Sequence, residues 1–77
     1  MEALVRDLKP GEGARVTGFA PGDRGYRQRL LAMGLTPGVS FTVTRVAPLG
    51  DPVEVAVRGF KLTLRRGEAA ILKVERV

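Results

Sequence analysis

Residues 27–38 read Arg-Gln-Arg-Leu-Leu-Ala-Met-Gly-Leu-Thr-Pro-Gly, and they carry the clearest helix signal in the chain. Tyr26, Leu30 and Met33 recur at the i, i+4 and i+7 spacing that places side chains on one face of an α-helix. Leu31 widens this apolar stripe. The rest of the circumference carries side chains that we expect in solvent, namely Arg24, Arg27 and Arg29. The pattern predicts one short helix that packs through a single face.

Both ends of this helix carry stop signals. Asp23 suits the N-cap position, because its carboxylate can accept hydrogen bonds from the free N–H groups of the first turn. Gly34 suits the left-handed position that closes a helix, and Leu35 then contacts Leu30 in a Schellman motif. The dipeptide Pro37–Gly38 predicts a turn that delivers the chain into a strand.

Length and composition limit the remaining choices. The 77 residues suffice for one domain, which we place at residues 1–77. No cysteine is present, so disulfides and thiolate metal sites are excluded and an intracellular location is expected. No apolar run reaches the roughly 18–20 residues that span a bilayer, and the N-terminus lacks a signal-peptide pattern. The sequence therefore predicts a soluble, cytosolic protein.

The charge balance indicates the chemistry of a partner. Ten arginines and three lysines against eight carboxylates give a net charge of +5. Such a surface favours nucleic acid, an anionic membrane or an acidic protein face, although a merely solvated arginine-rich surface explains the composition equally well.

The other apolar residues follow the period of two that is typical of β-strands. After an apolar anchor at Leu4, Val5 and Leu8, we expect strands at residues 15–19, 39–46, 53–58, 60–65 and 71–77, with strand ends fraying into a turn at Arg58–Gly59, and a single helical turn at residues 67–70. Short strands with tight Gly and Pro turns predict a mainly β fold. The expected architecture is a small closed or nearly closed barrel of about five strands, with one short α-helix inserted after the first strand.

The predicted core consists of the inward-facing residues of these elements, namely Val16, Leu30, Val39, Phe41, Val43, Val55, Val57, Leu62, Leu64 and Val74. The chain also lacks histidine, which removes the commonest general base and, with cysteine absent, the commonest transition-metal ligands. The carboxylates are scattered singly along the chain. We therefore expect no enzyme, no cofactor and no metal site, and carboxylates gathered by folding remain the one route to a hard cation.

Residues 48–52 read Pro-Leu-Gly-Asp-Pro and interrupt the strand pattern, since two prolines cannot both lie in a β-ladder. Two interpretations are open. Leu49 either folds back onto the core, as loop leucines often do, or it stands at the tip of a stiff loop as part of a partner surface.

These stretches resemble the signature of the FeoA family, the small cytosolic proteins of bacterial ferrous iron transport. The helix exit at residues 29–38 is followed at the expected separation by Ala-Pro-Leu-Gly-Asp-Pro at residues 47–52. Leu4, Leu8 and the Pro-Gly pair at residues 10–11 match the opening of the family pattern. Residues 64–69, Leu-Arg-Arg-Gly-Glu-Ala, match its closing motif. The resemblance spans nearly the whole chain.

The resemblance implies an SH3-like barrel and a partner, the cytoplasmic part of the GTPase-coupled ferrous iron permease FeoB. The family is also labelled as binding transition metals. Because this chain has no histidine or cysteine, we expect iron to be the cargo of the system and not a ligand of the protein. The expected function is that of a non-enzymatic adaptor, recruited to the inner face of the membrane by its partner.

For this adaptor we expect a partner-binding surface made of two segments, with the residues Arg27, Arg29, Met33, Leu35, Pro48, Leu49, Gly50, Asp51 and Pro52. Structural roles are expected for Leu30, Gly34, Pro37 and Gly38. The alternative function is a basic barrel that binds nucleic acid, or a regulatory interaction domain like that of iron-dependent repressors. Sparse aromatic residues and scattered basic residues count against nucleic acid. Self-association stays open.

Overall fold

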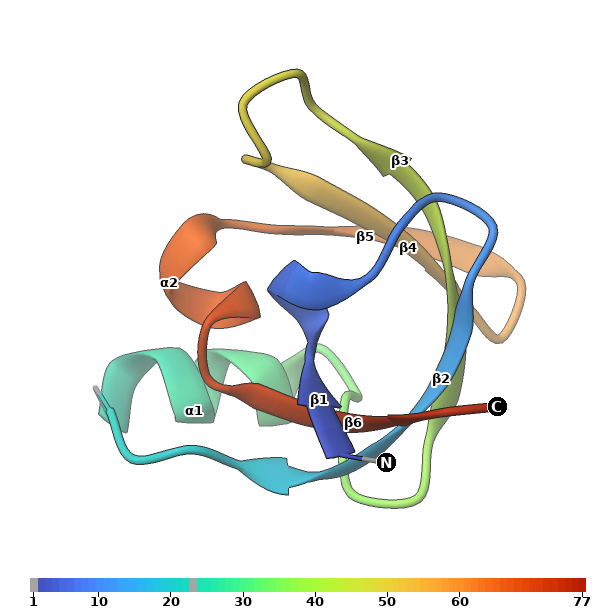
Figure 1. The fold of residues 1–77 in the computed structure, drawn as a ribbon. Helices are drawn as coiled ribbons and strands as arrows, with labels where there is room; N and C mark the ends of the chain where they lie inside the picture. Colours follow the sequence, from blue (N-terminus) through green and yellow to red (C-terminus); the bar gives the residue numbers. More distant parts are fainter. Residues whose placement is uncertain (1, 23) are drawn as a thin grey trace.

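Within residues 2–22 and 24–77, which the computed structural model describes, six antiparallel strands wrap around one apolar core (Figure 1). The strands are β1 (Glu2–Leu4), β2 (Gly13–Phe19), β3 (Ser40–Val46), β4 (Val53–Val57), β5 (Phe60–Leu64) and β6 (Leu72–Arg76). The helical elements are the 3-10 helix η1 (Val5–Asp7) and the α-helices α1 (Arg24–Ala32) and α2 (Arg66–Ala69). The expected mainly β fold is confirmed.

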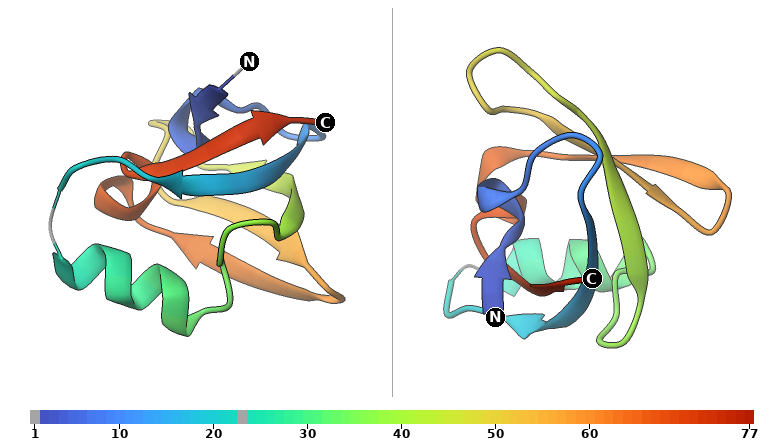
Figure 2. Two further views of the ribbon diagram at one scale, coloured as in Figure 1. Left: turned by 90° about the horizontal axis from the view of Figure 1, so that it is seen from below. Right: turned by 45° about the vertical axis from the view of Figure 1, so that its right-hand side comes forward.

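The strands follow the order β1-β6-β2-β3-β4-β5, and every neighbouring pair is antiparallel. Figure 2 shows the sheet curling so that its strands enclose the core. The prediction of about five strands missed β1, which pairs with β6 through Ala3 opposite Val74. Three residues are too short to display an alternation, and the helix α1 consequently follows the second strand and not the first.

The irregular stretches of two strands coincide with shifts of register. The pairing of β2 with β6 shifts between Val16 and Gly18, and the pairing of β3 with β4 shifts between Val43 and Arg45. Bulges of this kind bend a strand and increase its twist, which a small barrel requires. The bulge in β2 accounts for the imperfect alternation of apolar and polar side chains at residues 15–19.

The end of α1 has the predicted Schellman geometry. Gly34 has a φ of +92°, the Leu35 N–H donates to the Leu30 carbonyl at 3.0 Å, and the Gly34 N–H donates to the Leu31 carbonyl at 3.0 Å. Leu30 and Leu35 are both fully buried. The predicted N-cap, Asp23, lies outside the described residues.

The second reversal, at Pro37–Gly38, is a β-turn. The Val39 N–H donates to the Thr36 carbonyl at 3.1 Å, and Gly38 has a φ of +97°, as position i+2 of a type II turn requires. The Gly38 N–H then donates to the Val16 carbonyl at 2.8 Å, which joins the turn to β2. The structural roles predicted for Pro37 and Gly38 are consistent with this turn.

The predicted core residues are buried except Leu62, which is half-buried against the core. The sequence did not place Ala14, Val53, Ala69, Ile71 and Leu72 inside, although all are buried. Leu31 was wrongly assigned to the packed stripe of α1. Its side chain is 38% exposed, because one helical step of 100° separates it from the buried Leu30.

The turn at Arg58–Gly59 is confirmed, with positive φ at both residues as a type I′ hairpin needs.

Replacing Leu30 by alanine is expected to lower the free energy of unfolding by about 2–5 kcal/mol, because the fully buried side chain leaves a cavity. Leu31→Ala is the matched control from the same helix, and its exposed position predicts a loss within about 1 kcal/mol. Urea unfolding of both variants measures the difference. Equal losses would contradict the packing of α1 through the Leu30 face.

Candidate partner-binding surface

The loop between β3 and β4 is a closed hairpin loop with little freedom. The Ala47 N–H donates to the Pro52 carbonyl at 3.1 Å, and the Gly50 N–H donates to the Ala47 carbonyl at 2.8 Å. Gly50 adopts a φ of +82°, which suits a glycine at this reversal. Pro48 and Pro52 fix two further φ angles. The loop is thus ordered by its own backbone before any partner is present.

Leu49 stands at the tip of this loop with 87% of its surface exposed. The interpretation in which Leu49 folds back onto the core is therefore wrong. Beside the tip lies a hollow of about 250 Å³ lined by Arg45, Ala47, Pro48, Pro52, Glu54 and Thr63. In addition, the Asp51 Oδ1 atom is buried and has no hydrogen-bond partner among the residues described. An exposed leucine on a stiff loop next to a hollow is suited to contact with another protein.

The helical half of the predicted surface contains residues with different surroundings. Arg27 and Arg29 are exposed, while Met33 is half-buried against the core. Leu35 is fully buried, because the Schellman motif turns its side chain inward. Its predicted role as a contact residue is therefore corrected to a core role.

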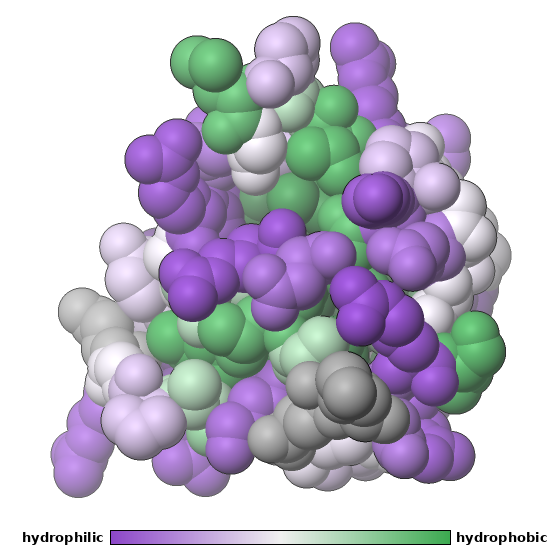
Figure 3. Space-filling model, viewed as in Figure 1, coloured by the Kyte–Doolittle hydropathy of each residue, from purple (hydrophilic) through white to green (hydrophobic). Residues whose placement is uncertain are grey.

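The two predicted segments do not form one continuous surface. The β3–β4 loop lies at the top of Figure 1 and α1 near the bottom, and they remain apart in both views of Figure 2. Figure 3 shows hydrophobic side chains gathered over the loop, with hydrophilic side chains below them. The candidate surface at the loop and any contact surface on α1 are thus separate regions.

The sequence did not identify the joint between α1 and α2. Glu68 is almost fully buried, and its Oε1 accepts the Arg65 N–H at 2.8 Å, as the N3 glutamate of a capping box does. Its Oε2 lies 3.4 Å from Nη1 of Arg29, whose side chain is 61% exposed. A Cβ added to Gly67 would lie 2.6 Å from the Tyr26 ring, so glycine permits the close approach of the helices. The spacing Arg65-x-x-Glu68 was the available signal.

Other arginines pair with carboxylates on the strand side of the molecule. Arg15 Nη2 lies 2.7 Å from Glu75 Oε2, and Arg76 Nε lies 3.3 Å from Glu12 Oε2. The hydrogen bond from Arg15, and then the attraction of its charge, hold the pKa of Glu75 below its usual value. Exposed pairs of this kind contribute little to stability. Arg29, which the sequence analysis placed in a partner contact, is likewise paired within the protein, with Glu68.

The described residues show no cluster of three or more carboxylates that would surround a metal ion. Within the same residues, no helix is both long and apolar enough to cross a membrane. The features that stand out are a stiff apolar loop tip and exposed arginines around a small β barrel. These features make the loop tip the candidate contact surface of a small β barrel.

The chain belongs to the FeoA family, because the model of the FeoA domain matches residues 4–76. A similar curated protein, the Fe(2+) transport protein A/Fe(2+) transporter FeoB fusion protein of Porphyromonas gingivalis, is 42% identical over 50 residues. That alignment covers 65% of this chain and 6% of the fusion protein, so the chain spans only a small part of that relative.

Solved structures agree with the family assignment. The FeoA protein of Chlorobium tepidum is 41% identical with a TM-score of 0.85, over 97% of this chain and 70% of that one. IdeR of T. acidophilum has a TM-score of 0.88 at 22% identity, over 99% of this chain and 34% of that one. The second likeness shows the fold alone.

Replacing Glu68 by alanine is expected to lower the free energy of unfolding by about 1–3 kcal/mol, because the Arg65 N–H loses its acceptor. Glu75→Ala removes an exposed carboxylate of the same type and serves as the control, with a much smaller expected effect. Chemical denaturation compares the two. A loss from Glu68→Ala no larger than that from Glu75→Ala would show that the α1–α2 joint is unimportant for stability.

The lowered pKa of Glu75 predicts a pH dependence. Because the folded-state pKa is depressed, the pair with Arg15 stabilises the protein above the unfolded-state pKa, and this stabilisation is lost as pH falls through the folded-state pKa. An NMR titration of the Glu75 carboxyl should show its pKa rising toward the ordinary value of a glutamate in Arg15→Gln. An unchanged pKa of Glu75 in that variant would refute the assignment to Arg15.

Proposed function

We propose that this protein is a cytoplasmic accessory protein of bacterial ferrous iron uptake, which docks on the cytoplasmic part of a FeoB-type GTPase-coupled permease and catalyses no reaction itself. Membership of the FeoA family supports the link to ferrous iron transport. The P. gingivalis relative, named as a fusion of the A protein with the FeoB transporter, supports the choice of partner, since fusion holds two proteins together permanently. Binding would recruit the protein to the inner face of the membrane.

The observation that carries the docking proposal is the exposure of Leu49 on an ordered loop. Burying an exposed leucine side chain contributes roughly 1.5–3 kcal/mol. Because the backbone hydrogen bonds and prolines already hold the loop, little conformational entropy is lost on binding. A partner pocket that accepts Leu49 would therefore gain most of this energy.

Charge then guides the encounter. Arg45 is exposed near the base of the loop and lines the hollow beside Pro48 and Pro52. Positive side chains around an apolar anchor accelerate association with an acidic surface, and salt weakens this effect. The proposed surface therefore consists of Leu49 as the anchor, the residues of the loop around it and Arg45 as the charged rim.

Leu49→Asp is expected to abolish binding to the cytoplasmic part of the permease while leaving the melting temperature nearly unchanged, because 87% of the Leu49 surface is exposed. An NMR titration of ¹⁵N-labelled protein with that part of the permease measures both the contact and its location. The expected shifts lie at residues 47–52 and Arg45.

Val77→Asp is the matched control, because it introduces the same charge at another exposed apolar position and should leave binding intact. Shifts that avoid residues 47–52, or binding by Leu49→Asp equal to that of the unmodified protein, would overturn the docking site. A fall in melting temperature with Leu49→Asp would assign the residue a structural role instead.

A further inference from the structure

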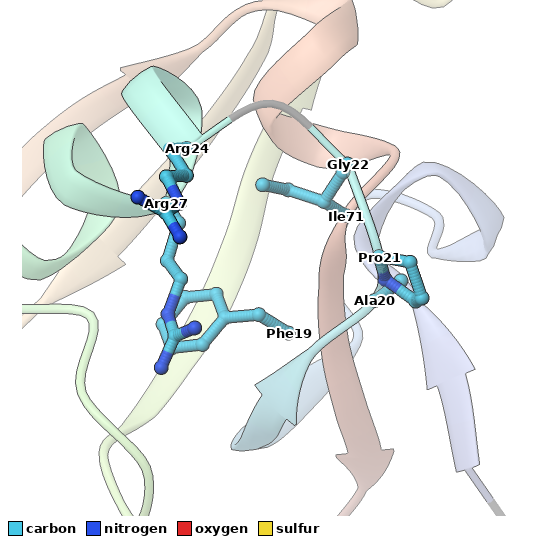
Figure 4. Close-up of a pocket in the computed structure, with 7 residues that line it drawn as sticks. All are labelled: Phe19, Ala20, Pro21, Gly22, Arg24, Arg27 and Ile71. Carbon is cyan, nitrogen blue, oxygen red and sulfur yellow. The ribbon is translucent and has the colours of Figure 1, made fainter.

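A second cleft, of about 310 Å³, lies between the end of β2, the start of α1 and the residue that precedes β6 (Figure 4). Its apolar part comes from Phe19, Pro21 and Ile71, and its charged part from Arg24 and Arg27. In Figure 4 the Ile71 and Phe19 side chains extend from the strand side toward α1, and the Arg27 side chain reaches past the Phe19 ring. The volume is at the lower end of the range of ligand sites.

The two arginines of this cleft are available for an external anion. Arg27 Cζ lies 5.5 Å from the centroid of the Phe19 ring, so the ring holds the guanidinium by a cation–π contact. Among the described residues, neither Arg24 nor Arg27 has a carboxylate within salt-bridge distance, in contrast to Arg29. A guanidinium held in this way keeps N–H groups free to bind a carboxylate in a bidentate manner.

The cleft continues onto the outer face of α1. A neighbouring hollow of about 330 Å³ is lined by Arg24, Arg27, Gln28 and Leu31, so both hollows share the two arginines. Leu31 supplies an exposed apolar contact there. The order along this surface is therefore an apolar hollow, two positive charges, and a second apolar contact.

We propose that this surface binds an acidic peptide segment of a partner protein, with carboxylates on Arg24 and Arg27 between two aliphatic side chains. One aliphatic side chain occupies the hollow at Phe19 and Ile71, and the other lies against Leu31. The net charge of +5 attracts such a segment from a distance. This site is at the other end of the molecule from Leu49 and does not depend on the docking proposed there.

The surface fits a peptide better than other anions. A free phosphate would engage the arginines alone and leave both apolar contacts in water. A nucleic-acid base would need an open aromatic face, but the Arg27 guanidinium already covers the Phe19 ring. Adjacent acidic groups flanked by apolar side chains are instead the chemistry of a protein segment.

The test uses the full chain, labelled with ¹⁵N, and the end-blocked peptide Gly-Leu-Asp-Glu-Leu-Gly as the probe. Three further probes isolate its parts: Gly-Leu-Asn-Gln-Leu-Gly without charge, Gly-Ala-Asp-Glu-Ala-Gly without the leucines, and inorganic phosphate. Saturable amide shifts at residues 19–31 and at Ile71 are expected with the first peptide, and weaker binding with each of the others.

The double variant R24Q/R27Q is expected to bind the first peptide at least about tenfold more weakly, since charge-assisted hydrogen bonds are lost. The variant R6Q/R58Q removes the same charge at two exposed positions elsewhere and should bind as the unmodified protein does. Leu31→Ala should weaken binding several-fold, while its small effect on stability leaves the protein folded.

Three results would overturn the proposal: no saturable shifts with the first peptide, equal weakening by both double variants, or phosphate alone binding as tightly at the same residues. The last result would identify a simple anion site.

Discussion

The double reversal at residues 34–38 is the constraint on which the rest of the structure depends. Gly34 allows the chain to leave α1 through a left-handed conformation, Leu35 enters the core, and the following turn bonds to Val16 of β2. A helix of nine residues is too short to be stable alone, since isolated helices need about 12–15 residues. Its position is therefore set by this backbone attachment and by the burial of Leu30, and α1 can then meet α2.

The fold was largely predictable because its signals are local. Alternation in β3, β4 and β5 and the glycine signals at residues 34 and 59 each act within a few residues. The sequence did not reveal the strand β1, because three residues are too few to show an alternation of apolar and polar side chains. The sequence did not reveal the exposure of Leu31 either. Periodicity gives the direction of a side chain on the helix, but it does not give the width of the helix surface that the strands cover. The burial of Glu68 depends on α1 packing over it, which a capping-box spacing does not reveal.

The candidate surface was less predictable for a geometric reason. Residues 29–35 and 48–52 are neighbours in the sequence signature, but β3 runs between them. Seven residues of extended strand carry the chain roughly 20 Å away from the turn at residues 36–39. Leu35 and Leu49 also look alike in the sequence, both apolar and next to a glycine. Only the direction of each turn decides that one is buried and the other exposed.

The β3–β4 loop and α1 lie apart on the protein, so the two proposed contact surfaces can be occupied at the same time. A partner chain that engages both ends makes its second contact intramolecularly, so its avidity depends on the linker between its two contact segments. The Cα trace extends at most 27 Å along any principal axis. A linker of on the order of eight extended residues is the minimum that reaches across such a span, and longer linkers lower the effective concentration only gradually. With both proposed surfaces engaged, the protein would hold two segments of one partner at a fixed separation, or join two different partners.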